Sequence, residues 1–96
     1  MTKELIKEKL LSDNRWLARG VLAIYEKQTY DEQQAEATKE DNGVGFNGVD
    51  AYILSSFAKQ LKQGRTLSSK QLLIARKKMP KYAGQLLQIA KEKGNA

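Results

Sequence analysis

The sequence contains no cysteine and no histidine, and these absences remove many of the side chains on which enzymes depend. Without cysteine there is no disulfide, no thiol nucleophile and no thiolate ligand for zinc or iron. Without histidine the chain lacks the side chain most often used as a general acid or base near neutral pH. We therefore expect a protein that is not an enzyme and that binds neither a metal ion nor another cofactor.

Proline and long apolar runs are also scarce. There is one proline, and no apolar run approaches the roughly 18 residues that a membrane span needs. Residues 1–11 mix Lys and Glu with Leu and Ile, unlike the basic start and uninterrupted apolar stretch of a signal peptide. The sequence predicts a protein without membrane contact, located in the cytoplasm of a bacterium or of an infected host cell.

The 96 residues, 41% of them hydrophobic, suffice for one domain with a modest core. Alternating β-branched runs and hairpin signals are nearly absent, whereas apolar residues recur at helical spacing along most of the chain. We predict an all-α protein, a compact bundle of five to six short helices in a single domain over residues 1–96. The expected helices cover about residues 3–11, 15–28, 29–39, 48–63, 68–79 and 81–93.

Helix boundaries are indicated by capping and breaking residues. Asn47 is placed to cap the helix that starts near Gly48, and Gly64 suits the position just after its end. Ser68 and Gln71 have the spacing of a capping box, and Pro80 predicts a boundary between the last two helices. Apolar residues on the inner faces should share one core: Trp16, Ile24, Val49, Ile53, Phe57, Leu61, Leu72, Leu86 and Ala90.

Charge divides the chain into two unequal parts. Residues 1–58 carry a net charge of −3, whereas residues 59–96 carry +9, with Glu92 as their one acidic residue. Such asymmetry suggests an anionic partner for the basic part. The alternative is that these lysines only keep the surface solvated.

The segment from Gly43 to Gly48 matches the pattern G-x-G-x-x-G. A dinucleotide fold needs a strand before this motif and an acid about 20 residues after it, and neither is present. Two interpretations remain: backbone amides ahead of a helix hold a phosphate, or the glycines make a tight connection. Phe46 in this segment either plugs the core or is exposed to stack on a base.

Acidic residues gather ahead of this segment, at Asp31, Glu32, Glu36, Glu40 and Asp41. Their spacing is not that of a calcium-binding loop, so we expect a solvated acidic face.

Cations line up at the start of the basic part. Lys70 and Lys77 are seven residues apart and therefore share one helix face, with Lys78 and Lys81 near them. Such a face fits a partner made of phosphates, because each neutralised phosphate releases counterions. Two helices around a short turn also suggest helix-turn-helix geometry, but Pro80 in the turn makes that match weak.

Five motifs carry a resemblance to a known module: QTYDEQ at 28–33, NGVGFNGVDA at 42–51, LSSKQ at 67–71, ARK at 75–77 and KYAGQL at 81–86. They resemble a short module found in phage and plasmid proteins and at the ends of helicase-like DNA-processing proteins. The resemblance covers about residues 25–90 and leaves the N-terminal helices, residues 1–24, outside it. It implies a nucleic-acid-related role for Phe46, Asn47, Lys70, Arg76, Lys81 and Tyr82.

Two functions from different classes follow. The first is a small nucleic-acid-binding module, for DNA rather than RNA, that contacts phosphates with little sequence specificity. Its expected contacts are Phe46, Asn47, Arg65, Lys70, Arg76, Lys77, Lys78 and Lys81. The second is a phage or mobile-element protein that binds and inhibits or modulates a host protein, such as a nuclease or a defence complex. Exposure of both Phe46 and Ile74 would favour base stacking or a protein interface over simple phosphate contact.

Overall fold

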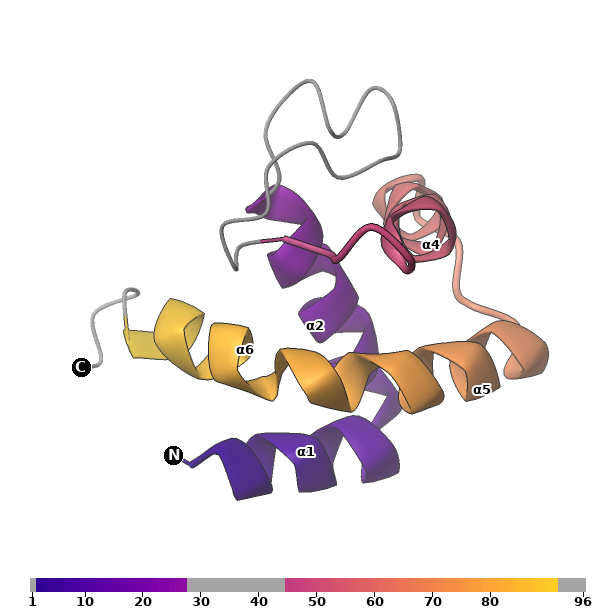
Figure 1. Cartoon of the computed structure of the whole chain (residues 1–96). Helices are drawn as coiled ribbons and strands as arrows, with labels where there is room; N and C mark the ends of the chain where they lie inside the picture. Colours follow the sequence, from indigo (N-terminus) through magenta and orange to yellow (C-terminus); the bar gives the residue numbers. More distant parts are fainter. Residues whose placement is uncertain (1, 28–44, 92–96) are drawn as a thin grey trace.

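A computed structural model describes residues 2–27 and 45–91, and within these ranges the chain is helical without a strand (Figure 1). The prediction of an all-α protein is confirmed. The elements are α1 (Lys3–Ser12), α2 (Asn14–Glu26), α4 (Ala51–Lys62), α5 (Ser69–Lys78), the 3₁₀ helix η1 (Met79–Tyr82) and α6 (Ala83–Ala90). The helix expected over 29–39 and the acidic residues around it lie outside the described residues.

The helix ends follow the local signals in the sequence. The Asp13 side chain accepts hydrogen bonds from the backbone amides of Arg15 and Trp16, at 2.8 and 3.4 Å, and so caps α2. Ser68 and Gln71 form the expected capping box at the start of α5. These two caps confirm two of the predicted helix starts.

The C-terminal end of α4 also confirms a prediction. Gly64 has a φ of 85°, a left-handed conformation that favours glycine. The Gly64 amide donates to the Leu61 carbonyl at 3.0 Å, and the Arg65 amide donates to the Gln60 carbonyl at 3.2 Å. This pair of bonds is the Schellman motif, which satisfies the last carbonyls of the helix.

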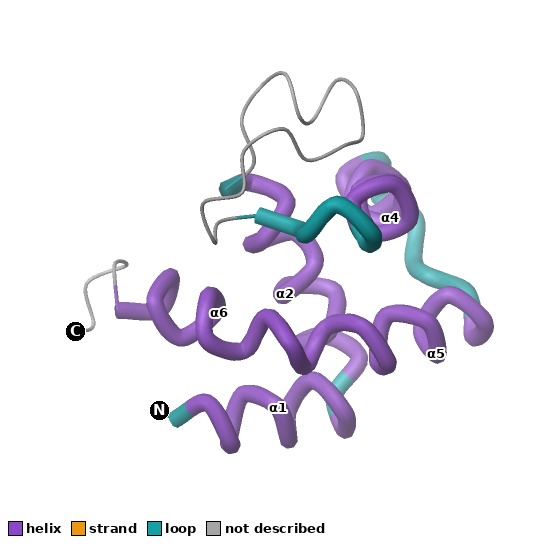
Figure 2. Tube along the Cα trace, viewed as in Figure 1, coloured by secondary structure: helices purple, strands orange, loops and turns teal. Residues whose placement is uncertain are grey.

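The helix boundary predicted at Pro80 is present, because α5 ends at Lys78, but a 3₁₀ helix takes the place of the expected turn. α5, η1 and α6 follow one another without a loop and form one continuous rod, which we call the C-terminal rod. It lies alongside α1 (Figures 1 and 2). Pro80 stands in the first turn of η1, where its missing N–H leaves no hydrogen bond unmade. The described residues therefore form four helical rods instead of five to six separate helices, and no helix-turn-helix occurs at Pro80.

α2 lies at the centre of the bundle, where it contacts α1, α4 and the C-terminal rod. Gly20 lies where α2 meets α1 and the C-terminal rod. A Cβ atom at this position would lie 3.1 Å from Leu10 Cδ2 and 3.3 Å from both Leu86 Cδ1 and Met79 Cε. The absence of a side chain at position 20 thus allows α1, α2 and the rod to meet.

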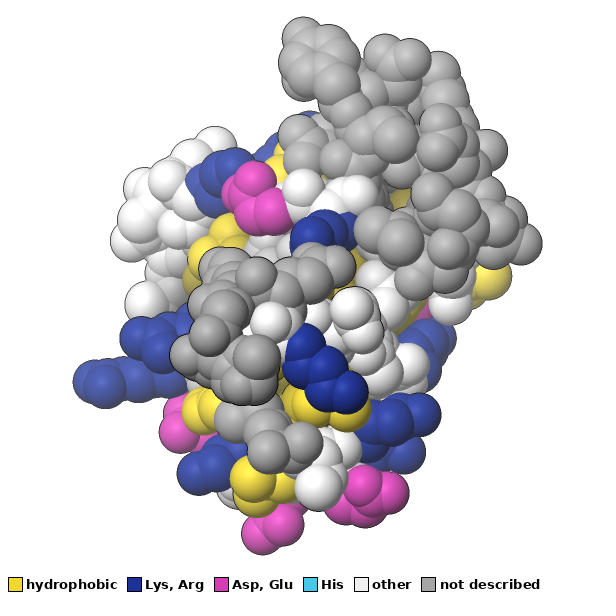
Figure 3. Space-filling view, turned by 90° about the vertical axis from the view of Figure 1, so that its left-hand side faces the viewer, with side chains coloured by type: hydrophobic (Ala, Val, Ile, Leu, Met, Phe, Trp, Pro, Cys, Tyr) yellow, Lys and Arg dark blue, Asp and Glu magenta, His cyan; other side chains and the backbone are white. Residues whose placement is uncertain are grey.

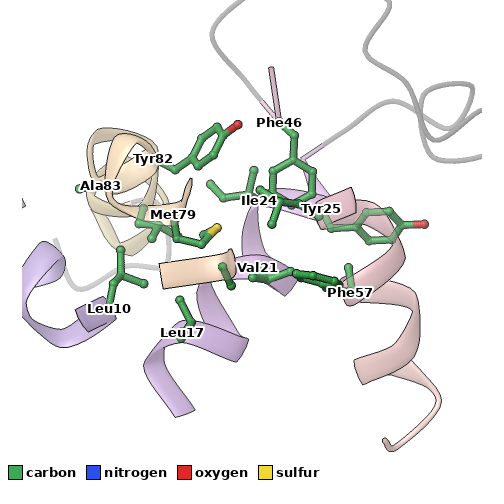
Figure 4. Packing of buried hydrophobic residues seen from close by; sticks show 14 of the residues in the cluster. Leu10, Leu17, Val21, Ile24, Tyr25, Phe46, Phe57, Met79, Tyr82 and Ala83 are labelled. Atoms are coloured by element: carbon green, nitrogen blue, oxygen red, sulfur yellow. The ribbon is translucent and has the colours of Figure 1, made fainter. Parts of the chain in front are cut away.

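The core is larger than the predicted set and partly different from it (Figure 4). Ile24, Phe57 and Leu86 are buried as expected, and Trp16, Ile53, Leu61 and Leu72 pack against the core while partly exposed. Ala90 is partly exposed as well. The prediction for Val49 is wrong: its exposed fraction is 85%, because it belongs to the turn before α4. The buried hydrophobic residues outside the predicted core list of nine are Ile6, Leu10, Leu17, Val21, Tyr25, Phe46, Ala51, Leu54, Ala58, Leu67, Ala75, Met79, Tyr82 and Ala83.

Phe57→Ala should lower the free energy of unfolding by about 3–5 kcal/mol, because it empties the space of a buried ring. Val49→Ala is the matched control on the same segment, and it should change stability by no more than about 0.5 kcal/mol. Chemical denaturation of the two variants measures both values. Similar losses for the two would contradict this assignment of the buried face.

Candidate nucleic-acid interface

The backbone of the glycine-containing segment is held by side chains of the C-terminal rod. The Gly45 amide donates to Gln85 Oε1 at 2.9 Å, and Gln85 Nε2 donates to the Gly45 carbonyl at 3.0 Å. The Asn47 amide donates to Tyr82 Oη at 3.1 Å. The amides of Gly45 and Asn47 are therefore engaged within the protein. Of the two interpretations of this segment, the described residues support a tight connection; Gly43 lies outside them.

Phe46 is a core residue, with 1% of its surface exposed. Its ring meets the ring of Tyr82 edge-on, with 5.7 Å between the centroids and 76° between the planes. Figure 4 shows Phe46 reaching down from the loop toward Ile24, with Tyr82 beside it. A buried ring presents no face to a base, so the structure places Phe46 as a plug of the core.

Asn47 makes the expected capping contact, although the helix begins later than expected. Its Oδ1 accepts from the Asp50 amide at 2.9 Å, three residues further on, as an N-cap side chain does. Residues 48–50 form a turn, and α4 begins at Ala51 instead of near Gly48. The Asn47 side chain therefore orders the approach to α4.

Asp50 is the central polar group of this region, although it is not among the site residues predicted from the sequence. Its side chain is 0% exposed. Its carboxylate accepts from Tyr82 Oη at 2.7 Å, from Lys81 Nζ at 2.7 Å and from Lys78 Nζ at 3.1 Å. A buried charge is strongly unfavourable unless it is paired and hydrogen-bonded, and these three donors provide both. The contact ties the start of α4 to the C-terminal rod.

The ionisation of this cluster follows from its contacts. Burial alone would raise the pKa of Asp50, but the hydrogen bonds from Lys81, Tyr82 and Lys78 together outweigh burial and hold that pKa below its ordinary value of 3.8. Burial raises the pKa of the Tyr82 hydroxyl. The Asn47 amide opposes this increase and the Asp50 carboxylate adds to it. At neutral pH Asp50 is thus ionised and Tyr82 remains protonated as a donor.

The predicted contact residues fall into three groups. Arg65, Lys70 and Lys77 are exposed, the first in the loop before α5 and the other two on its outer face. Lys78 and Lys81 turn toward Asp50, so one buried negative charge offsets part of their positive charge.

Arg76 forms the third group, because it reaches across to α2. One guanidinium nitrogen, Nη2, donates to Asn14 Oδ1 at the start of that helix, and the residue is half-buried. This contact links α5 to α2. The outward alignment of Lys70 with Lys77, predicted from their spacing, is matched by the exposure of both residues.

Apolar residues accompany the exposed cations. Leu73 lies between Lys70 and Lys77 on α5 and is 58% exposed. Ile74 is half-buried and lines a groove between α4 and α5, together with Ile53. Of the two residues whose exposure bears on the functional alternatives, Phe46 is thus buried and Ile74 is partly accessible.

The charge of the molecule is not uniform. On the face over the ends of α1 and α6, Lys and Arg side chains are interspersed with Asp and Glu (Figure 3). Lys62 of α4 forms a 2.7 Å ion pair with Glu26 on α2. The exposed cations of α5 and of the loop before it are therefore a local feature.

No protein-family model matches the chain, and comparison with curated proteins and with solved structures gives no significant match. The resemblance to a phage and plasmid module stays an expectation. Across residues 2–27 and 45–91, none of the helices has the length and apolar character to cross a bilayer. In the same residues, no three Asp or Glu side chains come together as metal ligands could.

Asn47→Ala should lower the free energy of unfolding by about 0.5–2 kcal/mol, because it removes the side-chain acceptor of the Asp50 amide. Thermal or chemical unfolding measures the change. Asn47→Asp is the control, since it retains an acceptor at this position. Unchanged stability in the alanine variant would show that the Asn47 side chain does not stabilise the start of α4.

Acid should destabilise the protein through Asp50. Because the pKa of Asp50 is lower in the folded chain than in the unfolded chain, its contribution is present above the ordinary value of 3.8 and is lost as the pH falls through the folded pKa. Asp50→Asn should be less stable at neutral pH, and its stability should fall less steeply below about pH 4. Parallel acid unfolding profiles for the two proteins would contradict this role.

Proposed function

We propose that the protein is a small nucleic-acid-binding module that contacts phosphates through exposed cations on and next to α5. Arg65, Lys70 and Lys77 form this phosphate-contact surface. The observation that carries the proposal is the exposure of Lys70 and Lys77 on one helix face within a segment, residues 51–91, that contains no Asp or Glu. Cations without neighbouring carboxylates on their own segment attract an anionic polymer.

The dimensions of the surface agree with a backbone contact. Seven residues of α-helix span about 10 Å, so Lys70 and Lys77 can meet different phosphates of one strand. Phosphate contacts position a protein on nucleic acid but carry no direct sequence information. Binding should therefore depend weakly on sequence and strongly on salt.

The structure narrows the set of contacts that the proposal needs. The Phe46 ring is buried, which argues against a stacking role, and the Asn47 side chain is used in capping. Lys78 and Lys81 share the charge of Asp50, so we expect each to contribute less than Lys77. The proposed contact is consequently electrostatic.

Lys77→Gln should weaken binding to all sequences about equally and lower the slope of log affinity against log salt by about one. Lys7→Gln is the matched control, because it makes the same change at an exposed position on α1 and should leave the slope nearly unchanged. A salt titration with single- and double-stranded DNA and RNA measures both. The proposal is wrong if no nucleic acid binds at roughly 50 mM salt, or if the two variants behave alike.

A further inference from the structure

A groove of about 460 Å³ runs between α4 and α5 and continues onto the loop that joins them. Ile53 and Phe57 of α4 form one side, and Ile74 of α5 forms the other. Arg65 and Lys70 also line the groove, and among the residues that the structure describes they are the only charged ones there. Its described lining thus combines apolar walls with cations and includes no carboxylate.

The frame of this groove is fixed by paired amides. Gln60 Nε2 donates to Gln71 Oε1 at 3.1 Å, and Gln71 Nε2 donates to Gln60 Oε1 at 2.9 Å, so the two side chains bridge α4 and α5. Gln60 Nε2 also donates to the Thr66 carbonyl at 2.8 Å, and Gln71 Oε1 accepts from the Ser68 amide at 2.8 Å. Because these hydrogen bonds already fix the side chains and the loop, the groove loses little conformational freedom when it binds a ligand.

The chemistry of the groove favours a protein segment over a nucleobase. A base is recognised by stacking on an accessible aromatic ring and by free hydrogen-bonding groups at its edge. The Phe57 ring is 3% exposed, and the amides of Gln60 and Gln71 are engaged with each other. What the groove offers is aliphatic contact from Ile53 and Ile74 and positive charge.

We propose that this groove binds an acidic amphipathic helix of a partner protein. Aliphatic side chains from one face of that helix insert between Ile53 and Ile74, and its flanking carboxylates pair with Arg65 and Lys70. This site goes beyond the proposed nucleic-acid contact, which needs only exposed cations. Because Arg65 and Lys70 belong to both surfaces, the helix and a nucleic acid compete for the protein.

The test uses the full chain, labelled with ¹⁵N, and three synthetic 15-residue peptides. The first has leucines at helical spacing on one face and glutamates elsewhere. The second has the same composition but leucines scattered around the helix, and the third replaces every glutamate with glutamine. The first peptide should bind and shift the amide signals of Ile53, Arg65 and Ile74, whereas the other two should bind at least about tenfold more weakly.

Variants of the protein locate the site. Ile74→Gln should weaken the first peptide about tenfold, because it removes one aliphatic wall. Leu73→Gln, on the neighbouring outward position, is the control and should change affinity by less than about twofold. Arg65→Gln, in the exposed loop, tests the charge contact without altering the core, and it should also weaken binding. Thermal unfolding checks that each variant is folded.

Three results would overturn the proposal. The first is that the scattered peptide binds as tightly as the first peptide, and the second is that the first peptide does not bind. The third is that an oligonucleotide of 15 thymidines shifts the amide signals of the groove and binds more weakly to Ile74→Gln. The last result would make the groove a nucleic-acid site. The proposed nucleic-acid contact is tested separately, because Lys77→Gln should lower the affinity for the oligonucleotide but leave the affinity for the peptide unchanged.

Discussion

The carboxylate of Asp50 lies fully enclosed at the start of α4, where three donors from the C-terminal rod converge on it. Each of these contacts joins residues about thirty positions apart along the chain. The pairing holds one end of α4 against the rod, while Gln60 and Gln71 bridge α4 and α5 near the other end. The groove lies beside the Gln60–Gln71 bridge and extends onto the loop that joins the two helices.

The same carboxylate influences which positive charges face the solvent. The basic part of the sequence reads as one block, but the fold uses its members differently. Lys78 and Lys81 compensate Asp50, and Lys62 pairs with Glu26. Lys70 and Lys77 are exposed on the outer face of α5. The net charge of a segment thus overstates the charge available to a partner, because a buried acid and a neighbouring helix each reduce it.

Features that depend on residues three or four apart could be predicted from the sequence. The cap at Ser68 and the left-handed Gly64 are of this kind, because their geometry involves one turn of backbone. The outward alignment of Lys70 and Lys77 follows from helical periodicity alone. Such signals predicted the fold class and the exposed part of the candidate site.

Features that depend on distant residues could not be predicted in this way. Val49 fits the apolar spacing of α4, but the helix begins two residues later and leaves Val49 in solvent. Pro80 marks a change of helix type, and packing against α1 and α2 keeps the rod continuous. For Phe46 both interpretations were open, and its contact with Tyr82, 36 positions away, decides between them.

The meeting of α1, α2 and the rod at Gly20 has a consequence for the order in which the chain can fold. The atoms closest to the missing side chain come from Leu10, Met79 and Leu86, so both ends of the described chain contribute to this contact. During synthesis α1 and α2 leave the ribosome long before α6 exists to cover them. Until then their apolar faces are exposed to solvent or bound by a chaperone, because α6, which completes the core, is translated last among the described helices.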